Sequence, residues 1–212
     1  MAAAAIGLPT TFDSLFRKYA KSIPIPFLRA LAKKESSMNP NSCAGAACGL
    51  LQITSVVRDS WNRSHGTSYA KSDLLNPDLN VAMGVDLLER IAKAYSLHPS
   101  PNMKPNWRNK EFVKLVLAGW NSGYSEGGGV GKVASYLETR GLPVTHDNVF
   151  SYANAAGATV HLQNDAKRRW QAGVADLYFS QPDFGQVDTG SFLVKAGIAT
   201  LVGLLLARYI FK

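Results

Sequence analysis

The chain has 212 residues, of which 46% are hydrophobic and 18% are charged. This length and composition allow one domain with a sizeable core, and they exclude a disordered chain and a pair of large domains. The 23 Lys and Arg residues exceed the 15 Asp and Glu residues, so the net charge is +8. Such a charge favours an anionic partner, such as nucleic acid, anionic lipid or the bacterial wall. With only Cys43 and Cys48, the chain cannot be a disulfide-dense secreted scaffold or hold a four-cysteine zinc site.

The first part of the chain predicts two amphipathic helices. Residues 1–9 include an Ala-rich stretch without a preceding basic residue or a long apolar run, so we expect a flexible N-terminus and no secretion signal. Apolar residues recur at helical spacing between Phe12 and Tyr19, and again between Phe27 and Ala32. We therefore expect a folded domain over 10–180 that begins with these two helices.

The remainder of this domain is also predicted to be helical. A third helix should begin at Pro77 with Asn76 as its N-cap, and a central helix that includes residues 112–120 should stop at Gly123. Later helices are expected near residues 130–138, 148–156 and 159–179. Since no segment shows the alternation typical of a half-buried strand, the sequence predicts an all-α fold.

The C-terminal part has a different composition. Residues 181–190 contain Pro, Gly and Asp and are interpreted as a linker. Residues 192–211 are mostly apolar, with an uncharged run over 196–207. A helix of this length would span about 30 Å, enough to cross a bilayer, although the short uncharged run also fits a core helix or a helix lying in the interface. We expect a membrane-associating helix over 191–212.

Glu35 is the first candidate for chemistry. It lies on the same predicted helix face as Leu28 and Leu31, so its carboxylate should be directed towards the core. Partial burial and the negative end of the helix dipole both favour the protonated acid, which can donate a proton to a leaving glycosidic oxygen. The alternative is a surface residue that neutralises Lys33 and Lys34. The pattern alone leaves these two interpretations equal.

Four segments resemble motifs of the soluble lytic transglycosylase family, whose fold is lysozyme-like. Residues 35–40 (Glu-Ser-Ser-Met-Asn-Pro), followed by Gly49-Leu50-Leu51-Gln52-Ile53, are similar to its first signature. The later motifs are matched by Asn76-Pro77 with Asn80-Val81 and Gly84, by Ala118-Gly119-Trp120-Asn121-Ser122-Gly123, and by Leu142-Pro143 with Tyr152. The resemblance covers roughly 27–155, and four motifs in the same order make it specific.

The resemblance implies a reaction and a set of site residues. Glu35 would protonate the bond between N-acetylmuramic acid and N-acetylglucosamine, while the substrate's acetamido group stabilises the sugar cation. It would then take a proton from the muramoyl 6-hydroxyl, which closes a 1,6-anhydro ring, so no second carboxylate is needed. The implied substrate-binding residues are Ser36, Gln52, Trp120, Asn121 and Tyr152. Trp120 replaces the family's usual Tyr, and Asn148, four residues before Tyr152, stands where the family often has Glu.

Other polar groups are given simpler interpretations. Cys43 and Cys48 flank a Gly-containing loop and could form a disulfide or remain two small buried thiols. The histidines lack zinc-ligand spacing, so no metal and no other cofactor is expected. The basic cluster Lys167-Arg168-Arg169 is interpreted as a solvated helix face that suits acidic stem peptides, and no nucleic acid partner is expected.

We therefore expect an enzyme that cleaves peptidoglycan glycan strands and associates with a membrane through residues 192–211. The missing secretion signal favours a bacteriophage enzyme carried in the virion and used at infection or host lysis, and a bacterial envelope enzyme is the alternative. Two other functions remain open. One is a hydrolytic muramidase or a cross-link endopeptidase on the same fold, and the other is a non-catalytic wall-binding or membrane-anchored assembly protein.

Overall fold

The computed structural model describes residues 7–185. Its α-helices are α1 (Asp13–Tyr19), α2 (Ile25–Ser36), α3 (Ser55–His65), α4 (Pro77–Ser96), α5 (Lys110–Ser122), α6 (Val130–Glu138), α7 (His146–Tyr152) and α8 (Asp165–Phe179). Short 3-10 helices lie at η1 (Ser72–Leu75), η2 (Pro101–Met103) and η3 (Val160–Gln163). The strands are β1 (Cys43–Ala44), β2 (Ala47–Cys48) and β3 (Ile53–Thr54).

The expectation of an all-α fold is wrong in one detail, because the mostly helical chain contains a small antiparallel sheet. Its strand order is β1-β2-β3, and Cys48 pairs with both Cys43 and Ile53. Each strand has only two residues. Such strands are too short to show a period of two, so alternation of apolar and polar residues could not reveal them.

Local signals set several helix boundaries where they were predicted. Helix α4 begins at Pro77, and the side chain of Asn76 accepts a hydrogen bond from the amide of Asp78 at 3.0 Å. Helix α5 stops at Gly123, whose φ of 88° is accessible to glycine. Other boundaries differ: α7 ends at Tyr152, and Asn164 separates η3 from α8 and caps α8. Helix α3 is absent from the predicted elements, and none of its residues is buried.

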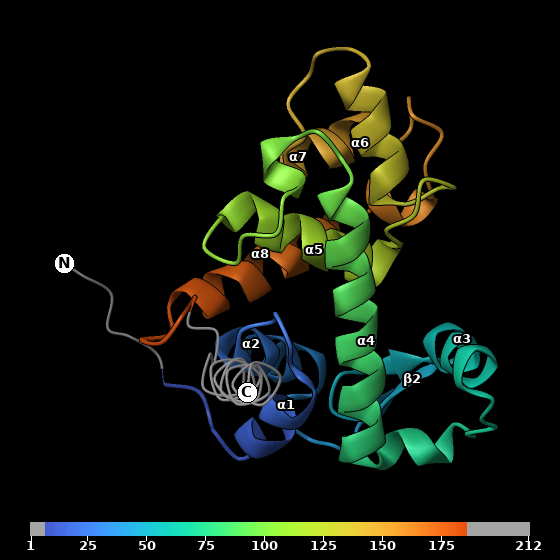
Figure 1. Cartoon of the computed structure of the whole chain (residues 1–212), viewed down its shortest axis with the longest axis vertical. Coiled ribbons are helices and arrows are strands. Elements are labelled where there is room, and N and C mark those ends of the chain that lie inside the picture. Colours follow the sequence, from blue (N-terminus) through green and yellow to red (C-terminus); the bar gives the residue numbers. More distant parts are fainter. Residues whose placement is uncertain (1–6, 186–212) are drawn as a thin grey trace, which may run out of the picture.

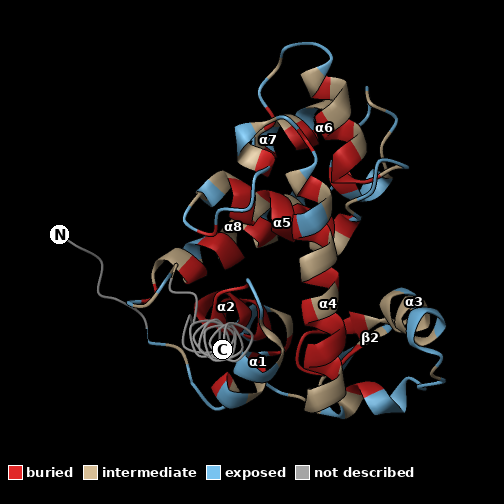
Figure 2. Cartoon of the chain, in the orientation of Figure 1, coloured by how far each residue is buried: buried red, intermediate tan, exposed pale blue. Residues whose placement is uncertain are grey.

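The long helix α4 connects two groups of elements (Figure 1). Helices α1 to α3 and the strands lie around its first half, whereas α5 to α8 lie around its second half. Helix α8 packs against both α2 and α5, which joins the two groups. Buried residues follow the inner sides of α2, α4, α5 and α8, while α3 has only intermediate and exposed residues (Figure 2).

The chain after α8 folds back onto α2. Gln181 is buried and donates to the carbonyl of Pro26 at 2.6 Å, and Asp183 accepts a hydrogen bond from Arg29 at 2.7 Å. Arg29 also pairs with the buried Asp13. The first half of the expected linker, residues 181–185, is thus attached to the domain.

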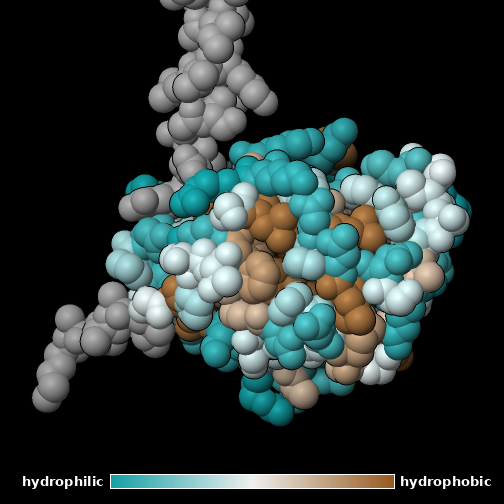
Figure 3. All heavy atoms as spheres, turned by 90° about the horizontal axis from the view of Figure 1, so that it is seen from below, coloured by the Kyte–Doolittle hydropathy of each residue, from teal (hydrophilic) through white to brown (hydrophobic). Residues whose placement is uncertain are grey.

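The polar sides of the helices face outwards. Seen from below, hydrophilic side chains surround a smaller hydrophobic area on that face of the domain (Figure 3). Within residues 7–185, no helix is long and apolar enough to cross a membrane. The predicted flexible N-terminus lies mostly, and the predicted helix over 191–212 entirely, outside the described residues.

Candidate active site

Helix α2 carries Glu35 in its last turn. Leu28 and Leu31, on the predicted face, are fully buried, and this packing fixes the helix against the core. Directly after the helix, Ser37 and Met38 have positive φ angles of 56° and 67°, so the chain turns away sharply. As a result, the Glu35 side chain is partly buried but still lines an open cleft.

Trp120, in the last turn of α5, contacts the candidate acid directly. Its indole Nε1 donates a hydrogen bond to Oε1 of Glu35 at 2.7 Å. Gly84 of α4 makes room for this arrangement, since a Cβ there would lie 2.6 Å from a Leu51 methyl group and 3.4 Å from the Trp120 ring. The glycine of the second motif therefore lets α4 pack closely against residues of the first and third motifs.

Burial raises the pKa of Glu35 from its usual value of 4.5 to about 7, and the hydrogen bond from Trp120 opposes this rise. Removing the carboxylate from water disfavours its charged form, whereas an N–H donor stabilises that form. The two effects leave the group near half-protonated at neutral pH. Such a carboxyl group can both donate and accept a proton.

The cleft beside Glu35 has a volume of about 680 Å³. Its walls come from the sheet region, α3, α4, α5 and the start of α8. Among residues 7–185, Glu35 is the only carboxylic acid that lines it. The lining residues include Ala44, Ala47, Gln52, Val57, Leu87, Trp120, Asn121, Tyr124, His161 and Lys167. The cleft is thus formed by several elements, and most of its lining side chains are uncharged.

The loop between β2 and β3 is held by buried hydrogen bonds. Asn80 of α4 is fully buried, accepts from the amide of Leu51 at 2.7 Å and donates to the carbonyls of Cys48 and Leu74. Gly49, with a φ of 87°, passes so close that a Cβ there would lie 2.1 Å from the Asn80 amide nitrogen. These contacts explain why an asparagine and a glycine occur together in the motifs.

Ser36 and Gln52 both attach this loop to its surroundings. The Ser36 hydroxyl donates to the carbonyl of Leu50 at 2.8 Å, and it does not bond Glu35. The Gln52 amide nitrogen donates to the carbonyls of Ser42 and Gly49, although its side chain also lines the cleft. Ser36 therefore links α2, which carries Glu35, to the loop between β2 and β3.

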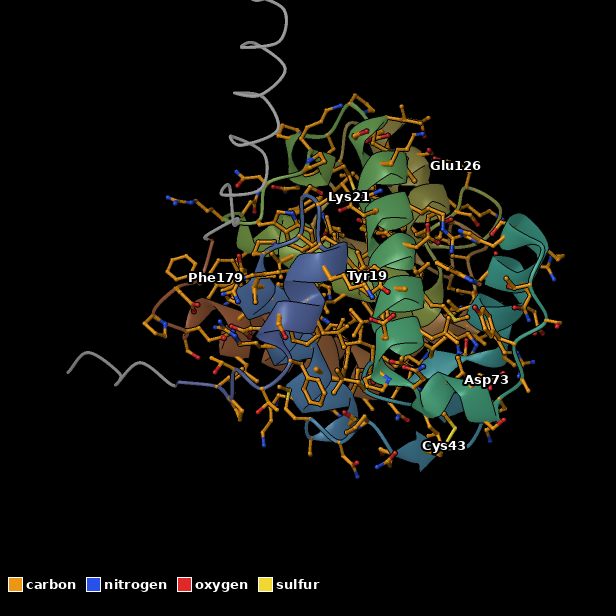
Figure 4. All side chains as sticks on the ribbon, turned by 60° about the horizontal axis from the view of Figure 1, so that its bottom comes forward. Tyr19, Lys21, Cys43, Asp73, Glu126 and Phe179 are labelled. Atoms are coloured by element: carbon orange, nitrogen blue, oxygen red, sulfur yellow. A yellow bond between two sulfur atoms is a disulfide. The ribbon has the colours of Figure 1, made fainter. Side chains whose placement is uncertain are left out.

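Cys43 and Cys48 form a disulfide that joins β1 to β2 (Figure 4). Of the alternatives left open by the sequence, the structure thus has the bridge. Ala44 and Ala47, which lie between the two cysteines, line the cleft. The disulfide consequently constrains one wall of the candidate site.

The two remaining predicted site residues are placed differently. Asn121 lines the cleft, and its side-chain oxygen accepts a hydrogen bond from Gln171 at 2.5 Å. Tyr152 is not among the residues that line this cleft, and its ring lies 6.2 Å from that of Tyr136. The structure therefore brings Glu35, Gln52, Trp120 and Asn121 to one cleft, with Ser36 behind it and Tyr152 elsewhere.

Several cleft residues were not among the predicted site residues, and Tyr124, His161 and Lys167 are those with a titratable side chain. Tyr124 directly follows the third motif, so its position offered a signal. His161 and Lys167 come from η3 and α8, and only the tertiary structure brings them into the cleft that Glu35 lines. In the described part of the chain, no cluster of three His, Cys, Asp or Glu side chains could hold a metal ion.

A family model described as the transglycosylase SLT domain matches residues 14–128, which is more than half of the chain. The chain belongs to the transglycosylase SLT domain family. The match includes Glu35, Gln52, Trp120 and Asn121, whereas Tyr152 and Lys167 lie beyond it. No curated protein matches this SLT domain at a significant level.

Two similar solved structures agree with this fold. The 70 kDa soluble lytic transglycosylase of Escherichia coli matches with a TM-score of 0.55 and 20% identity, over 86% of this chain and 26% of that chain. A complex of the 70-kDa soluble lytic transglycosylase with bulgecin A gives a TM-score of 0.54 and 20% identity, over 85% and 26%. This SLT domain thus spans about a quarter of the length of those chains.

Proposed function

We propose that this SLT domain cleaves the glycosidic bond between N-acetylmuramic acid and N-acetylglucosamine in bacterial peptidoglycan. The observation that carries the proposal is the position of Glu35, whose raised pKa of about 7 makes it a proton donor in a cleft of about 680 Å³. Membership of a transglycosylase family and the similarity to soluble lytic transglycosylases support the same substrate.

In the proposed reaction, protonated Glu35 donates its proton to the glycosidic oxygen as the bond to the muramoyl C1 breaks. The resulting carboxylate then removes the proton from the muramoyl 6-hydroxyl. That oxygen bonds to C1, and the product has a 1,6-anhydro ring. Glu35 regains in the second step the proton that it gives up in the first, so one carboxylic acid is sufficient. Glu35 is the only such group that lines the cleft within residues 7–185. A glycosidase that uses water ordinarily requires a second carboxylate about 5 to 9.5 Å away.

Mass spectrometry of the products tests this proposal. The full chain is incubated with purified peptidoglycan beside Glu35→Gln, which removes the acid but preserves its shape. The matched control is Asp176→Asn, since Asp176 is exposed on α8 and does not line the cleft. We expect 1,6-anhydromuramoyl products from the wild type and the control, and none from Glu35→Gln.

Other products identify the alternatives. Reducing ends would indicate a hydrolytic muramidase, cut cross-links would indicate an endopeptidase, and binding without any release would indicate a wall-binding or assembly protein. Persistence of the anhydro products in Glu35→Gln would refute the role of Glu35.

We also propose that the enzyme acts beside a membrane, supported by the apolar composition of residues 192–211. Flotation of the full chain with anionic vesicles tests this, and a variant with two Asp residues within 196–207 should lose flotation. Location in a bacteriophage particle stays a prediction, which detection of the protein in purified virions would check.

A further inference from the structure

Lys167 is a basic residue in the cleft, at a position where burial and the helix dipole both disfavour a positive charge. Its side chain lines the cleft, and its Nζ donates to the main-chain carbonyl of Asn121 at 2.5 Å. Partial burial lowers the pKa of Lys167, since burial disfavours the charged form. Lys167 also lies in the first turn of α8, next to the positive end of the helix dipole.

Within residues 7–185, Lys167 lines the cleft without a carboxylate partner, although basic residues elsewhere on α5 and α8 have one. Arg168 pairs with Asp147 at 2.7 Å, and Lys110 pairs with Asp176 at 2.6 Å. Within residues 7–185, no carboxylate forms an ion pair with Lys167; its recorded partner is the neutral carbonyl of Asn121. An ammonium group has three N–H donors, so two remain available after this hydrogen bond.

Lys167 is also not the counter-ion of Glu35. The pKa of Glu35 is shifted by burial and by Trp120, and Lys167 is not among the causes. This separation suits the proposed reaction, because a cation next to Glu35 would lower its pKa and weaken it as an acid. Among residues 7–185, the cleft therefore holds a proton donor and a separate cation that has no carboxylate partner.

We propose that Lys167 binds a carboxylate of the peptide substituents on the glycan, and so makes the cleft prefer peptide-bearing strands over peptide-free strands. This inference rests on the proposed function. The sugar units offer hydroxyl and amide groups, for which neutral donors and acceptors suffice. The peptide substituents carry carboxylates, which form stronger, charge-assisted hydrogen bonds with an ammonium group. Lys167 is thus a specificity-determining residue, distinct from the acid.

A purely structural role for Lys167 is separable from this one, because its hydrogen bond to Asn121 holds the end of α5. Loss of that bond alone would disturb the cleft for every ligand equally. Lys167→Met removes the charge and the donors but keeps an unbranched side chain, whereas Lys167→Arg keeps both. The matched control is Arg169→Met, which removes an exposed charge two positions along the same helix.

The test measures binding, so it does not depend on turnover. All variants are made in the full chain with Glu35→Gln, and Kd is measured for soluble peptide-bearing glycan oligomers and for the same oligomers after enzymatic removal of the peptides. We expect the Lys167 protein to bind the peptide-bearing oligomers about tenfold more tightly. The preference should disappear in Lys167→Met and persist in Lys167→Arg and Arg169→Met.

Three results would overturn the inference: no preference in the Lys167 protein, a preference that survives in Lys167→Met, or equal weakening of both ligands by Lys167→Met. Cleavage of the same oligomers by the chain with Glu35 intact is measured separately. Absence of anhydro products there would count against the proposed reaction, whereas the ratio of the two Kd values decides the role of Lys167.

Discussion

Replacing Trp120 with Phe removes the donor that opposes protonation of Glu35. The hydrogen bond of 2.7 Å stabilises the carboxylate, so its loss should raise the pKa of Glu35 above about 7. A hydrogen bond to a charged group contributes about 1.5 to 3 kcal/mol, and 1.36 kcal/mol corresponds to one pKa unit. Because Glu35 is partly open to water in the cleft, we take the lower end, a rise of about one unit.

The alkaline limb of the pH profile measures this shift. Activity requires protonated Glu35 in the free enzyme, so kcat/KM should fall as the pH exceeds its pKa. At pH 8 the protonated fraction should increase from about one tenth to about one half. We expect the limb of Trp120→Phe to move about one unit towards higher pH, whatever the change in the maximal rate.

Trp170→Phe is the control, since it makes the same exchange outside the cleft and should leave the limb in place. A titration of Glu35 by NMR with carbon-13 labelled glutamate gives the pKa without turnover. An unchanged limb, or a limb moved to lower pH, would refute the assignment of Trp120 as a donor to the ionised acid.

Three further predictions concern stability. The pKa of Glu35 is raised in the folded state, so its ionisation destabilises the fold progressively between pH 4.5 and about 7. In urea denaturation, the free energy of unfolding of Glu35→Gln should exceed that of the wild type by up to about 3 kcal/mol at pH 8 and equal it at pH 4. Asn80→Ala removes the side-chain hydrogen bonds to three buried backbone groups and should lower the free energy of unfolding by about 3 kcal/mol. A loss below about 1 kcal/mol would contradict the role of Asn80 in holding the loop. Replacing Cys43 and Cys48 with Ser removes the disulfide and should lower the free energy of unfolding by about 2 kcal/mol, measured by thermal unfolding. In reductant, the variant and the wild type should be equally stable.

The sequence by itself determined the helices with strong apolar stripes and clear end signals, and it singled out Glu35. Helices α2, α4 and α5 follow from local spacing, an Asn N-cap and a Gly stop, because these effects act within a few residues. The two-residue strands are too short to carry a periodic signal, so the sequence did not predict them, and α3, which has no buried residue, was not predicted either.

Helical spacing alone does not distinguish a catalytic acid from a surface charge at Glu35. The motif resemblance favours the acid. Only the tertiary structure decided the rest of the site, because pKa, burial and hydrogen bonds depend on residues far apart in the chain. Trp120 reaches Glu35 across 85 positions, and Lys167 enters the cleft from α8. Ser36 and Gln52 occur in a motif with the acid, but the fold uses their hydrogen bonds to hold the loop, which spacing along the chain could not reveal.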